Sequence, residues 1–280
     1  TAPEQVIQIT EGPITKPVAD IPHLEGKLVD LGILDQDPTP EQAALVKGQI
    51  ALVTRGVVPF SEKLRRSVAA GAVAMVITND QPGDAFSMGG EGLYDIPAFM
   101  VTMDFGKILR QQISLGEVKV IIATTKAITN PELVDTIAAF SSKGPRSVDG
   151  LLKPEITAPG SNVISAGMGQ GYKSAKMSGT SMAAPHITGV MALLKQAHPD
   201  LSSLELKSLL MGHAKFLNDE NKKPYLLSRQ GAGRVQADLS VKGLIVSSDT
   251  VDFSLGKMSV KTSKKIKRTF HLRNISAKTL

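Results

Sequence analysis

Apolar and polar positions alternate with two different periods in the first part of the chain. Between residues 21 and 125, short apolar runs predict strands, and amphipathic stretches between them predict helices. Phe60, Leu64 and Val68, for example, recur at helical spacing after one such run. The predicted strands are 49–54, 72–78, 96–102 and 118–123. Strands and helices that alternate in this way are typical of an α/β unit.

Two segments of this region have a composition of their own. A helix is expected to begin at Asp104, which can act as its N-cap, and to run through Gln112, with Gly116 behind it. The Gly-rich segment from Asp80 to Asp95 could be a lid or a partner surface. Its composition favours a mobile, solvent-exposed loop.

The second half of the chain also mixes strand and helix patterns. Residues 134–140 are a strand candidate, and the run 187–194 is apolar nearly all round, which predicts a buried helix. Ser202 and Glu205 form a capping box ahead of a helix with a leucine-rich face. Beyond Val241, strand-like runs alternate with polar breaks and resemble the first strands of a β-sandwich.

One hydroxyl, that of Ser181, stands where a Gly-containing turn runs into the apolar helix. Gly179 permits backbone angles that a residue with a Cβ resists, and Pro185 fits the first helical turn, so the helix should begin at or just after Ser181. The unpaired N–H groups at a helix start would stabilise an oxyanion during acyl transfer. An isolated serine at such a place would more simply be a helix cap.

Composition and charge exclude several classes of function. The chain has no cysteine, which excludes disulfides, thiol catalysis and thiolate metal sites. Its net charge of +6 comes from residues 257–280, which hold eight basic and no acidic residues, and this basic end is interpreted as a solvated strand face. Aromatic residues make up 4% and do not interleave with basic ones, so no nucleic-acid partner is expected. No apolar run approaches about 18 residues and no signal peptide is visible, so no membrane span is expected.

The residues Gly179-Thr180-Ser181-Met182-Ala183, followed by Pro185, resemble the nucleophile signature of the subtilase (subtilisin-like serine protease) family. The match at every specified position favours a catalytic nucleophile over a helix cap. It implies a serine endopeptidase that hydrolyses peptide bonds through an acyl-enzyme on Ser181, with protein or peptide substrates and a secreted or cell-envelope location. His186, just past the signature, is interpreted as a structural helix residue. An α/β hydrolase is disfavoured, because Ala183 stands where Gly-x-Ser-x-Gly needs glycine.

Other segments of the second half match the same family. The stretch Phe140–Pro145 resembles the subtilase segment that returns to the substrate cleft. The resemblance implies that Phe140 binds substrate at the leaving-group side of that cleft, but a core aromatic residue at a strand end is an equally good interpretation. Segments assigned to the architecture around the nucleophile are 153–160, 163–166 and 230–235.

Much of the first half resembles the protease-associated domain, a module inserted in many subtilases. The matching segments are 47–56, 60–63, 70–72 and 96–98. Such a module implies recognition or access control rather than catalysis. Arg55 and Glu62 within it are interpreted as structural charges rather than ligand contacts.

The expected fold is therefore α/β, with the C-terminal part of a subtilisin-like parallel-sheet domain, an inserted α/β protease-associated domain and the start of a β-sandwich. The expected boundaries are 1–20 for a catalytic-domain connection, 21–126 for the protease-associated domain, 127–241 for the catalytic part and 242–280 for the sandwich start.

A subtilase nucleophile needs a histidine base and an aspartate, which the family places, with an oxyanion-hole asparagine, upstream of an inserted protease-associated module. No histidine here is followed by glycine, as the family's His-Gly-Thr requires, and Asp30-Leu31-Gly32 lies inside the inserted module. We therefore expect the C-terminal portion of a longer protease, which lacks activity alone and needs an upstream segment carrying Asp and His as its partner. No cofactor and no metal site are expected. The alternative is a non-catalytic protein-binding module built on the protease-associated domain.

Overall fold

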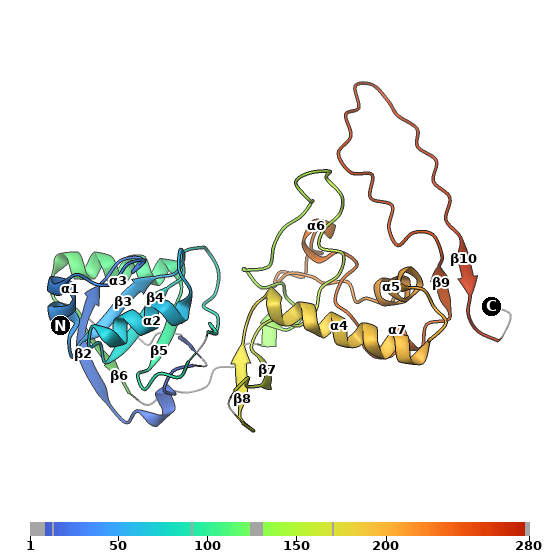
Figure 1. The fold of residues 1–280 in the computed structure, drawn as a ribbon. Helices are drawn as coiled ribbons and strands as arrows, with labels where there is room; N and C mark the ends of the chain where they lie inside the picture. Colours follow the sequence, from blue (N-terminus) through green and yellow to red (C-terminus); the bar gives the residue numbers. More distant parts are fainter. Residues whose placement is uncertain (1–8, 13, 91, 124–130, 170, 278–280) are drawn as a thin grey trace. The chain divides into compact units, whose positions relative to one another are not determined.

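The computed structural model describes residues 9–12, 14–90, 92–123, 131–169 and 171–277. The chain divides into two compact units (Figure 1). The first comprises Thr1–Ile128 and Ser161–Ser178, and the second comprises Thr129–Gly160 and Gly179–Leu280. Residues 1–8 of the expected connection and the expected boundary at 126–127 lie outside the described residues.

The first unit is built on a six-stranded sheet with the order β1-β5-β4-β3-β2-β6. Its four central strands, β2 to β5, run parallel, while β1 and β6 pair antiparallel at the two edges. The strands are β1 Thr10–Glu11, β2 Leu24–Asp30, β3 Ile50–Thr54, β4 Ala74–Thr78, β5 Ala98–Val101 and β6 Lys119–Ile122. Strands β3 to β6 confirm the four apolar runs of the sequence.

Helices cover both faces of this sheet, which explains the near-continuous apolar character of its central strands. Along β3, Ala51 and Val53 face a core shared with α1 (Pro40–Val46) and α2 (Phe60–Ala69). Ile50 and Leu52 face the opposite core, shared with α3 (Met103–Leu115). Successive side chains of a strand point to opposite faces, so one short run serves two cores.

The start of α3 corrects the capping prediction. Thr102, not Asp104, is the N-cap, and its hydroxyl accepts a hydrogen bond from the Phe105 amide at 3.3 Å. Asp104 lies in the first turn, where its charge suits the positive end of the helix.

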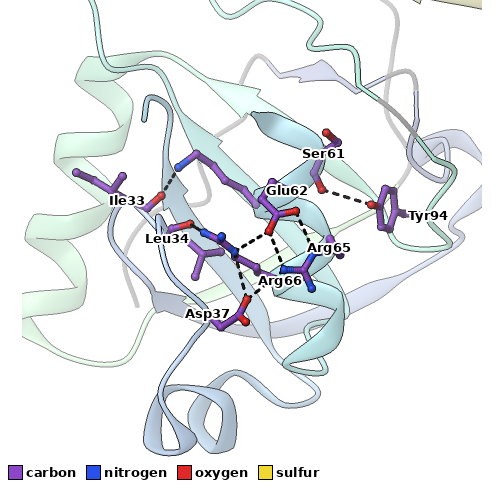
Figure 2. A network of polar contacts seen from close by, with 9 residues as sticks. Ile33, Leu34, Asp37, Ser61, Glu62, Arg65, Arg66 and Tyr94 are labelled. Carbon is purple, nitrogen blue, oxygen red and sulfur yellow. Dashed lines mark hydrogen bonds and ion pairs between the residues drawn. The ribbon is translucent and has the colours of Figure 1, made fainter. Parts of the chain in front are cut away.

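Charged side chains of α2 bind the loop that follows β2 (Figure 2). Arg65 Nη2 lies 2.7 Å from Glu62 Oε1 and 3.2 Å from Asp37 Oδ1. Arg66 donates to the Leu34 carbonyl at 2.9 Å. Lys63 is 1% exposed and donates to the Ile33 carbonyl, and burial lowers the pKa of its ammonium group. These contacts give Glu62 a structural role, as the sequence indicated.

The segment 80–95 is only partly the exposed loop that its composition suggested. Residues 81–84 are exposed, but Ser87 and Met88 are buried, at 2% and 8% exposure. Met88 belongs to the core beneath α1 and α2. The prediction of an exposed loop is therefore wrong for these residues, because the apolar side chain of Met88 anchors the Gly-rich segment in the core.

A β-hairpin completes the first unit. Strands β7 (Val163–Ala166) and β8 (Ser174–Met177) pair antiparallel, with Val163 opposite Met177. The Ser178 hydroxyl accepts a hydrogen bond from the Asn162 amide at 2.8 Å, which closes the open end of the hairpin.

The regular elements of the second unit are mainly helices, and α4, α5 and β9 share its core. Its helices are η2 Pro131–Leu133, α4 Thr180–Ala197, α5 Ser203–Gly212, α6 Leu227–Gln230 and α7 Ala237–Val241, and its strands are β9 Ile245–Ser247 and β10 Leu272–Asn274. The capping box ahead of α5 is confirmed, because Ser202 and Glu205 exchange both bonds. Strands β9 and β10 pair antiparallel, and residues 248–271 between them form neither helix nor strand.

Two predictions for the second unit are wrong. Helix α4 buries Val190 and Leu194, but Leu193 is 52% exposed, because the described residues cover one face of the helix only. Residues 134–140 form no strand; Val134 lies in a turn and Asp135 has a φ of 64°. None of the helices within the described ranges is both long and apolar enough to cross a membrane.

Candidate active site

Ser181 lies exposed in the first turn of α4, at the second helical position. Gly179 is the N-cap, and its carbonyl accepts from the amides of Met182 at 3.0 Å and Ala183 at 3.4 Å. The amides of Thr180 and Ser181 therefore precede the first helical hydrogen bond. The expected helix start is confirmed to within one residue, and with it a place where N–H groups can meet an oxyanion.

The turn before Ser181 is held by a close approach of two glycines. The Gly179 amide donates to the Gly160 carbonyl at 2.8 Å. A Cβ built on Gly160 would lie 2.9 Å from the Gly179 carbonyl oxygen and 3.2 Å from the Ala183 Cβ. The Gly179 carbonyl oxygen belongs to the backbone and cannot rotate away as the end of a flexible side chain can. Position 160 therefore requires glycine.

The segment that carries Gly160 is fixed in turn by the segment 230–235. The Thr157 amide donates to the Gly233 carbonyl at 2.8 Å, and the Val235 amide donates to Thr157 at 2.9 Å. Gly231 and Gly233 both have positive φ angles, and a Cβ on either would collide with neighbouring backbone. The two segments that the sequence assigned to architecture thus form one support beneath the nucleophile turn.

Pro185 corrects the expected helix geometry. It is the sixth residue of α4 and so lies in the second turn, inside the helix, rather than in the first. Proline has no amide hydrogen, so the helix cannot give the Ser181 carbonyl its usual donor four residues on. This carbonyl is therefore released from the helical ladder directly at the candidate nucleophile.

Three histidines of the second unit are engaged elsewhere in the described structure. His186 lies on α4 five residues after Ser181, which places it about 140° round the helix axis. His198 and His213 bond to backbone carbonyls at 2.9 Å, and His271 Nδ1 lies 2.8 Å from Asp249. The structural interpretation of His186 thus agrees with its place on the helix.

Phe140 is half-buried in a turn rather than at a strand end. The Ser141 amide closes this turn on the Ala138 carbonyl at 3.0 Å, and Arg229 donates to the Ser141 carbonyl. The turn is therefore tied to helix α6, while a role of Phe140 in substrate binding stays a prediction.

A partly exposed charge cluster fixes the segment before Phe140. Asp135 Oδ2 accepts from Lys215 at 2.7 Å, and its Oδ1 lies 2.6 Å from Arg234 Nε. The hydrogen bond from Lys215, together with Arg234, lowers the pKa of this carboxyl below its ordinary value. Within the described ranges, no three histidine, cysteine, aspartate or glutamate side chains are placed to share a metal ion.

Comparison of the chain with known proteins identifies its family. Residues 63–233 match the model of the subtilase family. The chain is 33% identical over 199 residues to the minor extracellular protease Vpr of Bacillus subtilis (strain 168), covering 70% of this chain and 24% of that protein. It is 32% identical over 242 residues to a C5a peptidase of Streptococcus pyogenes serotype M18, covering 83% and 19%.

A third relative is the PII-type proteinase of Lacticaseibacillus paracasei, 34% identical over 269 residues, covering 85% of this chain and 14% of that protein. The chain thus spans a quarter or less of the length of these three relatives. The family match includes Ser181 and its helix start, the segment that carries Gly160, and the segment 230–235 as far as Gly233. The chain belongs to the subtilase family of serine proteases.

Proposed function

We propose that Ser181 is the nucleophile of a serine endopeptidase. The observation that carries this proposal is the exposed hydroxyl in the first turn of α4, beside amides that precede the first helical hydrogen bond. The Ser181 oxygen attacks the peptide carbonyl, the C–N bond breaks, and the amine leaves with a proton. Water then hydrolyses the ester and regenerates the hydroxyl.

The remaining catalytic groups come, in this proposal, from a segment upstream of these 280 residues. The contacts of His198, His213 and His271, and the place of His186 on the far side of the helix, support this assignment. The upstream segment supplies the Asp, the His base and an oxyanion-hole Asn, while the Ser181 amide supplies the second oxyanion donor. Without a base this chain is inactive alone, because loss of the histidine in the subtilisin example costs about a factor of 10⁶ in turnover.

The finer organisation is part of the same proposal. Residues 21–126 act as a protease-associated domain that recognises partners or controls access, and the segment 47–56 that resembles this module forms β3 with its flanking turns. Residues 1–20 form the connection to the catalytic domain, 127–241 its C-terminal part and 242–280 the first strands of a β-sandwich. Phe140 borders the leaving-group side of the cleft.

The location and substrate class follow from the relatives. One is named an extracellular protease, and the others are named as a peptidase and a proteinase. We assign this protein to the secreted or cell-envelope proteases that act on proteins or peptides.

A fluorophosphonate probe tests the proposal directly. Its phosphorus bonds to an activated serine oxygen as fluoride leaves, and mass spectrometry then locates the modified peptide. We expect labelling of Ser181 in a longer protein that includes the upstream segment, none in Ser181→Ala, and undiminished labelling in the control Ser203→Ala, which removes an exposed hydroxyl at the start of α5. The 280-residue chain alone is expected to remain unlabelled. Labelling that survives in Ser181→Ala would contradict the assignment, and no labelling in the longer protein would favour the non-catalytic binding module.

A further inference from the structure

Gln230, the last residue of α6, is a fully buried polar side chain of the second unit. Its Oε1 accepts a hydrogen bond from the Leu217 amide at 2.7 Å, and its Nε2 donates to the Tyr225 carbonyl at 2.6 Å. Both partners are backbone groups, so the glutamine amide joins three separate stretches of the chain. We propose that Gln230 is a positioning residue for Ser181, acting through the support beneath the nucleophile turn; this inference rests on the proposed function.

The backbone of Gln230 begins one side of that support. Its carbonyl accepts a hydrogen bond from the Thr157 hydroxyl at 3.3 Å. Two residues on, the Ala232 amide donates to the Glu155 carbonyl at 2.9 Å. The Thr157 amide in turn donates to the Gly233 carbonyl at 2.8 Å. The end of α6 and the facing segment are thus bonded at successive positions, and a displacement of one would displace the other.

The facing segment leads directly to the nucleophile turn. Gly160 follows Thr157 after two residues, and its carbonyl accepts a hydrogen bond from the Gly179 amide at 2.8 Å. Gly179 is the N-cap of α4, and Ser181 is the second residue of that helix. The route from Gln230 to Ser181 therefore runs through hydrogen-bonded backbone that lies within one compact unit.

Removal of the glutamine amide would leave buried backbone groups without partners. The hydrogen bond from the Leu217 amide to the side chain is buried. An unpaired buried N–H costs free energy, so this stretch of backbone would shift toward another partner, and α6 would lose the contacts that fix its C-terminal end. A misplacement of about 1 Å at a reacting group can cost up to roughly a hundredfold in rate.

The test replaces Gln230 in the longer protein and follows the rate of fluorophosphonate labelling at Ser181. Gln230→Met keeps a side chain of similar length but has no N–H donor and only a weak acceptor. We expect it to slow labelling by about tenfold. For a peptide substrate, kcat should fall by a similar factor while KM changes by less than about twofold, because the nucleophile is displaced and the substrate site is kept.

The matched control is Gln236→Met. Gln236 also donates to a backbone carbonyl, that of His213 at 2.9 Å, but its side chain has no hydrogen bond to the support among the described residues. We expect this variant to be labelled at nearly the unmodified rate. Labelling of Gln230→Met at the rate of Gln236→Met would overturn the inference.

A second variant, Thr157→Val, tests the route itself and serves where Gln230→Met does not fold. It keeps the shape of the side chain but removes the hydroxyl that donates to the Gln230 carbonyl, and we expect labelling to slow by about threefold. In the double variant the slowing should be smaller than the product of the two single effects, since both changes act at one contact. An unchanged rate in Thr157→Val, or effects that multiply fully, would show that Gln230 does not act through this segment.

Hydrogen exchange gives a readout that does not depend on activity. The Gly179 amide is bonded to Gly160, so its exchange in the longer protein should be faster by about tenfold in Gln230→Met than in Gln236→Met. Equal exchange of the peptide that contains Gly179 would show that the loss of the glutamine amide does not reach the nucleophile turn.

The proposed function and the positioning role fail in different ways. If the unmodified longer protein is not labelled at all, the proposed function is contradicted and the positioning role falls with it. If labelling depends on Ser181 but is as fast in Gln230→Met as in Gln236→Met, only the positioning role is contradicted.

Discussion

The carbonyl oxygen of Gly179 lies 2.9 Å from the position that a Cβ on Gly160 would occupy, so the nucleophile turn rests on bare backbone. The same two residues share a hydrogen bond from the Gly179 amide to the Gly160 carbonyl at 2.8 Å. Close packing and hydrogen bonding at one place leave the turn little freedom to relax.

Gly160→Ala should therefore displace Ser181. We expect fluorophosphonate labelling of the longer protein to fall by about tenfold or more, and stability to fall by about 1–3 kcal/mol, because the added methyl group meets backbone atoms. The control is Gly189→Ala on α4, where a Cβ meets nothing within 4 Å and alanine favours the helix. Equal labelling rates in the two variants would show that the contact does not position the serine.

The local sequence pattern was sufficient to predict those elements whose structure depends on residues within the same segment. The apolar runs around β3 and β4 gave strands because both faces of these strands are buried, and the pair Ser202 and Glu205 gave a helix start because its two bonds are local. The placement of Ser181 at a helix start belongs to the same class, since Gly179 and the apolar run after it adjoin it in sequence.

Long-range contacts explain the predictions that were wrong. The text around Val134 is strand-like, but Asp135 adopts a φ of 64° and binds Lys215 and Arg234, which lie 80 and 99 residues away. The sequence around residue 134 contains no signal that predicts these two partners. The contact of Gly160 with Gly179 also joins separate segments of the chain, so the local pattern did not predict the need for glycine at position 160.

The capping box of α5 gives a second prediction, on stability. Ser202→Ala removes the hydroxyl that accepts the Glu205 amide hydrogen, and we expect it to lower the free energy of unfolding by about 1 kcal/mol. Ser203→Ala, one residue further on and exposed, should change that free energy by no more than about 0.5 kcal/mol. Denaturant titration of both variants measures the difference, and equal midpoints would mean that the box contributes nothing to the fold.

The buried ammonium of Lys63 gives a third prediction. Lys63→Met keeps the length of the side chain but removes the donor to the Ile33 carbonyl, and we expect a loss of about 1 kcal/mol for this part-buried hydrogen bond. Lys107→Met is the control, because that side chain is exposed on α3 and pairs with its helix neighbour Asp104. Chemical denaturation of the 280-residue chain would measure both. A stability of Lys63→Met at or above that of the control would show that apolar packing can replace the ammonium there.

The fourth prediction concerns pH and the ion pairs of Asp135. Its lowered pKa means that the folded state binds the carboxyl proton more weakly than the unfolded chain does. The resulting stabilisation is fully present above the ordinary carboxyl pKa of about 3.9 and is lost as the pH falls through the lower folded value.

Asp135→Asn should cost roughly 1–2 kcal/mol at pH 7, where it removes the charged partner of Lys215 and Arg234. Asparagine tolerates the positive φ at this position, so the backbone need not change. The difference in unfolding free energy between the two proteins, measured by urea titration from pH 7 downwards, should shrink below about pH 4. A difference that stays constant down to pH 2.5 would show that the ionised carboxylate is not what stabilises the segment ahead of Phe140.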